Sequence, residues 1–179
     1  MHIQTKLSNC CIRSWEPDDK LDLARNANNR KIWLNLTSMF PHPYTEIDAE
    51  KWIESANEPT LKTHLAIEFA GIAVGGIGIM ANDGVCCKTG DFGYWIGEPF
   101  WGKGIATAAA MIDYAFLNLP FVRLQAGVFA WNPPSMRVLE KVGFVREGVL
   151  KQSRYKDGQL IDSVMYALIK EEHLRNEKL

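Results

Sequence analysis

The sequence predicts a mixed α/β protein with a central sheet. Three observations indicate this class: β-rich apolar runs bounded by glycine, helices opened by capping residues, and a glycine loop between a strand and a helix near the middle of the chain. The chain has 179 residues, of which 47% are hydrophobic, so it can bury a sizeable core. We therefore expect residues 1–179 to form a single domain.

The first half of the chain is expected to supply two helices and the start of the sheet. A short strand over residues 10–14 precedes helical signals over residues 18–27. The run Thr45-Glu46-Ile47-Asp48 resembles a capping box, with threonine as N-cap and an acid three residues later, so a helix should begin there. The β-rich stretch 65–79 is interrupted at Ala70-Gly71, which predicts a hairpin.

The second half should contain, in order, a strand, an alanine-rich helix, a strand, a short helix and a hairpin, at residues 91–96, 103–118, 122–129, 132–140 and 154–169. Asn132 suits the N-cap of the short helix and Gly143 its end, because asparagine accepts hydrogen bonds from the first turn and glycine tolerates a left-handed conformation. Asp157-Gly158 is a typical hairpin turn.

Charge and terminal composition limit the possible partners. The formal net charge is −1, whereas nonspecific binding to nucleic acid or anionic membranes needs clustered Lys and Arg. The N-terminus lacks the apolar core of a signal peptide, and no apolar run reaches membrane-spanning length. We expect a cytoplasmic protein, monomeric or homodimeric, that binds neither nucleic acid nor membranes.

The four cysteines form two adjacent pairs, Cys10-Cys11 and Cys86-Cys87. Neither pair has the C-x-x-C spacing of common zinc sites, so we expect ordinary thiols and no metal site. If each pair lies in extended chain, one sulfur should point inward and the other outward, because strand side chains alternate.

The stretch from Trp101 to Thr107 is the strongest candidate for a binding site. Gly102 and Gly104 lack Cβ atoms, so backbone N–H groups there and at the following helix start can approach a phosphate or pyrophosphate. The overlapping run from Gly97 to Gly104 nearly matches a Walker A loop, but Gly104 replaces the Ser or Thr that holds magnesium. The stretch also departs from the dinucleotide fingerprint at Thr107. A turn without a ligand is the third interpretation.

Several motifs in order along the chain resemble the GNAT superfamily of acyl-CoA-dependent N-acetyltransferases. These motifs are Tyr94-Trp95-Ile96-Gly97, Trp101-Gly102-Lys103-Gly104-Ile105-Ala106, Asn132-x-x-Ser135 and Leu139-Glu140-Lys141-Val142-Gly143-Phe144. Within the superfamily, the chain is similar to the RimJ and RimL branch of ribosomal-protein N-terminal alanine acetyltransferases. This resemblance implies a GNAT fold, with a mostly antiparallel sheet of six to seven strands, splayed between the fourth and fifth, and about four flanking helices.

The resemblance also implies acetyl-CoA as the cosubstrate. Amides of the glycine loop would bind its pyrophosphate, and the strand end before the loop would bind its pantetheine arm. The cofactor-binding residues implied in this way are Trp95, Ile96, Gly97, Gly102, Lys103, Gly104, Ile105, Ala106, Thr107, Asn132 and Ser135. The structural alternatives are a solvated side chain for Lys103 and a helix cap for Asn132.

The predicted reaction is direct attack of a primary amine, from a protein N-terminus or a small molecule, on the thioester in a ternary complex. The branch implies that Ser135 acts near the thiolate, although a serine in a first helical turn also commonly caps the backbone. Asp91 could be the base only if a bulge changes the strand register. Glu68 and water are alternative proton acceptors.

Two departures from the family pattern allow an alternative function. Leu139 stands where many members carry a tyrosine acid, and Arg154 stands where the branch places an acidic base. A guanidinium cannot accept the proton of the amine. The alternative is therefore a non-catalytic acyl-CoA-binding module. The aromatic, proline-containing segment 33–44 is a candidate to gate the acceptor site, or else simply fills the core.

Overall fold

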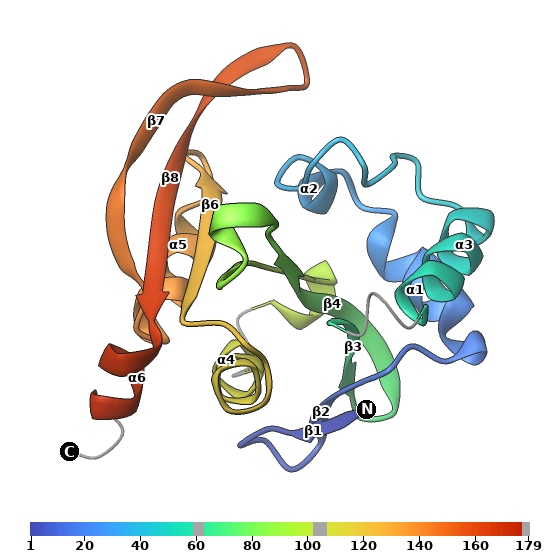
Figure 1. Ribbon diagram of the computed structural model, residues 1–179. Coiled ribbons are helices and arrows are strands. Elements are labelled where there is room, and N and C mark those ends of the chain that lie inside the picture. Colours follow the sequence, from blue (N-terminus) through green and yellow to red (C-terminus); the bar gives the residue numbers. More distant parts are fainter. Residues whose placement is uncertain (59–62, 102–106, 177–179) are drawn as a thin grey trace. The chain divides into compact units, whose positions relative to one another are not determined.

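The computed structural model describes residues 1–58, 63–101 and 107–176. Its eight strands form one sheet in the order β1-β2-β3-β4-β5-β6-β8-β7 (Figure 1). The strands are β1 (His2–Gln4), β2 (Cys10–Arg13), β3 (His64–Phe69), β4 (Ile72–Ala81), β5 (Thr89–Ile96), β6 (Arg123–Phe129), β7 (Val145–Lys156) and β8 (Gln159–Ile169). The helices are α1 (Lys20–Ala27), α2 (Arg30–Trp33), α3 (Glu46–Ala56), α4 (Thr107–Asn118), α5 (Pro133–Lys141) and α6 (Lys170–Asn176).

The predicted fold class is confirmed: the structure is mixed and its sheet is mostly antiparallel, with β5 and β6 as a parallel pair. Within the described residues there are eight strands instead of six to seven, and six α-helices instead of about four. The additional elements are short, namely β1, the one-turn helix α2 and the C-terminal helix α6. The splay between the fourth and fifth family strands stays a prediction.

The described chain divides into two compact units. The first consists of Met1–Gly78 with Gly93–Met111, and the second of Ile79–Phe92 with Ile112–Leu179. The single domain expected from the chain length stays a prediction. Among the described residues, no helix is long and apolar enough to cross a membrane.

In the first unit, α1 and α3 pack against each other and lie over β3 and β4 (Figure 1). Their shared core contains several alanines, including Ala24, Ala49 and Ala66, beside the buried rings of Trp15 and Tyr44. The capping box predicted for α3 is present, because the Thr45 hydroxyl and the Asp48 carboxylate each accept a hydrogen bond from the other's backbone amide.

The β3–β4 hairpin of the first unit turns where the sequence predicts it. Ala70 and Gly71 have φ values of 52° and 82°, which fits the two-residue turns that follow the twist of antiparallel strands. The pairing has a register shift between Ile67 and Glu68.

In the second unit, β8 lies between β6 and β7 and is antiparallel to both. The hairpin turns at Asp157-Gly158 as predicted, with φ values of 50° and 78°. Its first strand is longer than expected, however, and starts at Val145 instead of Arg154. Register shifts between Arg146 and Gly148 and between Leu150 and Arg154 interrupt its regular pairing with β8.

The predicted alternation of the cysteines is wrong for both pairs. Cys10 and Cys11 are both buried, at 2% and 8% exposure, because β2 is covered on both of its faces. Cys86 and Cys87 are both exposed, because they lie at the end of a short 3-10 turn and not in a strand.

Candidate active site

In the first unit, β5 ends at Ile96 and continues into a tight turn from Gly97 to Trp101. The Gly97 amide donates to the Val74 carbonyl of β4 at 2.7 Å. The amides of Phe100 and Trp101 then donate to the carbonyls of Gly97 and Glu98, forming a 3-10 turn. Pro99 fits in this first turn, because the amide that proline lacks would have no partner there.

Glycines allow other parts of the first unit to approach this strand end. A Cβ atom added at Gly75 of β4 would lie 2.2 Å from the Trp95 carbonyl oxygen, and one at Gly97 would lie 2.6 Å from Asn26 Oδ1. Asn26 is buried in α1, and its Nδ2 donates to the Ala73 carbonyl at 3.0 Å. The Asn26 amide therefore packs directly on the Gly97 backbone.

The Trp101 side chain folds back onto the end of β5. Its indole Nε1 donates to the Ile96 carbonyl at 2.6 Å, while 47% of the residue stays exposed. Backbone groups of successive strand residues point to opposite edges. Since the Gly97 amide faces β4, the Ile96 carbonyl lies on the other edge of β5, where it accepts the indole proton.

The predicted pyrophosphate cradle is only partly described. Gly102, Lys103, Gly104, Ile105 and Ala106 lie outside the described residues, so their role stays a prediction. Thr107, the first described residue of α4, is 2% exposed.

A cluster of polar side chains joins the turn after β5 to α2. Asn29 Nδ2 donates to Glu98 Oε2 at 2.8 Å, and the Lys31 ammonium pairs with Glu98 Oε1. The hydrogen bond from Lys31, followed by the one from Asn29, lowers the pKa of Glu98 below its ordinary value. No pattern in the sequence indicates that Asn29 and Lys31 meet Glu98, because they are 69 and 67 positions away from it in the chain.

In the second unit, Asp91 lies on β5 and accepts a hydrogen bond from Gln125 of β6 at 2.8 Å. The pairing of Thr89, Gly90 and Asp91 with three successive residues of β6 is regular. A Cβ at Gly90 would meet Ile79, Leu124 and Phe121. The Asp91 side chain therefore lies on the opposite face from Gly90, and the bulge on which its role as a base depends is not present in these three pairs.

Ser135 and Asn132 lie at the start of α5 in the second unit. Asn132 is the N-cap, and its Oδ1 accepts a hydrogen bond from the Ser135 amide at 3.3 Å, as predicted for a capping residue. The Ser135 side chain is half-buried. Leu139, at the position of the tyrosine found in many family members, is fully buried and so belongs to the core.

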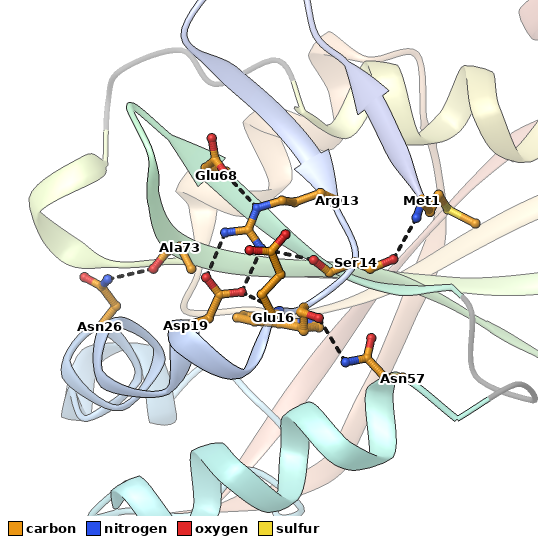
Figure 2. A network of polar contacts seen from close by, with 10 residues as sticks. Met1, Arg13, Ser14, Glu16, Asp19, Asn26, Asn57, Glu68 and Ala73 are labelled. Carbon is orange, nitrogen blue, oxygen red and sulfur yellow. Dashed lines mark hydrogen bonds and ion pairs between the residues drawn. The ribbon is translucent and has the colours of Figure 1, made fainter.

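Glu68 of β3 is bound in an ion-pair network with Arg13 of β2 and Asp19 (Figure 2). Arg13 Nε lies 2.5 Å from Glu68 Oε2, and the rest of the guanidinium makes two 2.7 Å contacts with the Asp19 carboxylate. Glu68 Oε2 is therefore occupied by the Arg13 guanidinium. This geometry argues against Glu68 as the base.

The eight-stranded, mostly antiparallel sheet and the tight turn after β5 define a mixed α/β fold. Residues 9–145 match the family of Acetyltransferase (GNAT) domains, and the chain belongs to this family. The predicted superfamily and enzyme class are confirmed.

Two curated relatives and one solved structure illustrate the similarity. The uncharacterized N-acetyltransferase YokL of the SPbeta prophage in Bacillus subtilis is 28% identical over 168 residues, or 92% of each chain. The ribosomal-protein-serine acetyltransferase of Escherichia coli is 33% identical over 84 residues, about half of each chain at 46% and 47%. Mycobacterium smegmatis RimJ in complex with CoA-disulfide superposes with a TM-score of 0.81 at 25% identity, over 91% of this chain and 83% of RimJ. These similarities confirm the predicted RimJ/RimL-like branch.

Proposed function

We propose that the protein transfers the acetyl group of acetyl-CoA to the N-terminal amine of a protein or peptide, by direct attack in a ternary complex. The membership of residues 9–145 in the GNAT acetyltransferase family carries the proposal. The RimJ relative was crystallised with a CoA derivative, and the Escherichia coli relative acts on ribosomal-protein serine. Acetyl-CoA-dependent N-acetylation is what the sequence predicted, and these comparisons confirm it.

Acetyl-CoA would bind at the end of β5, on the edge opposite β4, and continue into the glycine loop. The Ile96 carbonyl supports this placement, because it lies on the edge opposite β4 and already accepts an N–H donor, the Trp101 indole. An amide of the pantetheine arm could take the same position. In this proposal, the pyrophosphate is bound by backbone amides of residues 102–107.

The reaction forms a bond between the amine nitrogen and the acetyl carbon and breaks the bond between that carbon and the CoA sulfur. The Ser135 hydroxyl would donate a proton to the departing thiolate, while its backbone amide remains with Asn132. The amine would lose its proton to water. Asp91 is the acidic side chain to test by substitution, although the register change that its role as a base requires is not present in its pairing with β6.

The proposal includes a cytoplasmic location, where the free thiols would stay reduced. The predicted monomer or homodimer stays a prediction.

The direct experiment is to incubate the purified protein with acetyl-CoA and a panel of amines while following free thiol release. The panel should contain peptides that begin with serine or alanine, the same peptides with blocked N-termini, and small polyamines and amino acids. We expect thiol release and acetylated product only with free N-terminal peptides. Turnover only with small amines would overturn the proposed acceptor, and tight CoA binding without any transfer would favour the non-catalytic module.

A further inference from the structure

The turn that follows β5 is held by side chains from the N-terminal helices. We call Asn29, Lys31 and Glu98 the Glu98 cluster. Asn29 is the N-cap of α2, where its Oδ1 accepts from the Lys31 amide at 2.8 Å, while its Nδ2 donates to Glu98 at 2.8 Å. One amide side chain therefore both starts α2 and binds the turn.

The same turn is fixed at other points within the first unit. The Trp101 indole closes it onto the Ile96 carbonyl, and the Phe100 ring lies 6.1 Å from the ring of Phe69 on β3. Asn26 packs against Gly97 from α1. The end of β5 is therefore held both by the hydrogen bonds within the turn and by contacts from β3, α1 and α2.

We propose that Glu98 is a positioning residue for acetyl-CoA. Through Asn29 and Lys31, Glu98 connects the turn to α2, and the turn sets the direction of the Ile96 carbonyl. Acetyl-CoA binding would therefore depend on α2, a helix of the N-terminal segment. This inference rests on the proposed function, because it concerns the affinity for the same cosubstrate. The Glu98 cluster also connects the end of β5 to α2 and to the following residues 33–44.

Exposure indicates which contact contributes more. The Lys31 side chain is 64% exposed and that of Glu98 is 36% exposed, so solvent screens their ion pair. Asn29 is fixed at both ends of its amide, which makes its hydrogen bond the more directional of the two. The amide of Asn29 is therefore the atom group to change.

The sharpest test exchanges the hydrogen-bond donor and acceptor between positions 29 and 98. Asn29→Asp keeps an N-cap acceptor for α2, because Asp and Asn cap equally well, but it replaces the donor to Glu98 with a second carboxylate. Glu98→Gln in the same chain supplies a donor again, with the direction of the hydrogen bond reversed. In the single variant Asn29→Asp, the two carboxylates repel each other, and Lys31 offsets part of this repulsion. We therefore expect a moderate effect: KM for acetyl-CoA and Kd for CoA should rise about fivefold, with kcat within about twofold.

In the double variant Asn29→Asp with Glu98→Gln, both constants should return to within about twofold of the wild-type values. The control is Glu147→Gln, which breaks an exposed ion pair with Arg123 in the second unit and should leave KM unchanged. Thermal unfolding of every variant separates loss of folded protein from loss of affinity.

Three results would overturn the inference: wild-type KM in the Asn29→Asp variant, no recovery in the double variant, or a fall in kcat with KM unchanged. Wild-type protein that binds no CoA would overturn the proposed function itself, and the inference with it. Wild-type binding with an unaffected Asn29→Asp variant would overturn the inference alone.

Discussion

Replacing Arg13 by methionine should strongly destabilise the first unit. Arg13 is 9% exposed and Asp19 is 6% exposed, and the guanidinium joins Asp19 to Glu68 through contacts of 2.5 to 2.7 Å (Figure 2). The hydrogen bond to Asp19 raises the pKa of Arg13, so the group stays charged. Methionine has a similar length but leaves a buried carboxylate without its cation.

Removing one partner of a buried ion pair costs about 3–5 kcal/mol. We expect the low end, about 3 kcal/mol, because Asp19 would keep its hydrogen bond from the Glu16 amide at 2.8 Å and the Glu68 side chain is 26% exposed. The loss should therefore come mainly from the Asp19 carboxylate, which has the lower exposure.

Urea unfolding followed by tryptophan fluorescence measures this loss. The double variant Arg13→Met with Asp19→Asn should recover about 1 kcal/mol or more, because a neutral amide is less costly to bury than an unpaired carboxylate. If Arg13→Met alone stays within about 1 kcal/mol of the wild type, the network contributes no more than an exposed ion pair and the reasoning from burial is refuted.

Two further predictions concern the candidate site. Gly97→Ala places a Cβ 2.6 Å from Asn26 Oδ1, so Asn26 must lose its hydrogen bond to the buried Ala73 carbonyl. We expect the free energy of unfolding in urea to fall by about 1–3 kcal/mol. Wild-type stability would contradict the close contact. Ser135→Ala should keep the helix cap, which uses the backbone amide of this residue, but lower kcat about 100-fold with KM for acetyl-CoA nearly unchanged. Steady-state kinetics over a range of acetyl-CoA concentrations checks this, and an unchanged kcat would limit Ser135 to its structural role.

The sequence could predict the features that depend on neighbouring residues. The capping box at Thr45, the N-cap at Asn132 and the turn at Asp157-Gly158 all formed as predicted. Each is a local arrangement in which a short side chain or a glycine satisfies the backbone within a few positions. The helices that begin near Thr45 and Asn132 therefore have nearly the predicted bounds, whereas the strand before Asp157 starts at Val145 instead of Arg154.

Features that depend on distant contacts were missed. The burial of both Cys10 and Cys11 results from cover on both faces of β2, which no periodicity within four residues can reveal. Glu68 was a candidate base until its pairing with Arg13, 55 positions away, was seen. The partners of Glu98 are similarly remote, and polar residues in a helix start and a turn do not by themselves indicate that they meet.

Gly75 shows how a local weakness in the sequence can be necessary at long range. Glycine weakens a strand because it loses much backbone entropy and packs no side chain, yet β4 carries Gly75 and Gly76 in succession. A Cβ at Gly75 would lie 2.2 Å from the Trp95 carbonyl, and one at Gly76 would lie 2.8 Å from the Trp95 indole nitrogen. Both glycines therefore let β5 and its tryptophan lie directly on β4. The two glycines thus allow the end of β5 to be placed closely against β4, where the Gly97 amide bonds to β4 and the Ile96 carbonyl, the proposed contact for acetyl-CoA, lies on the opposite edge.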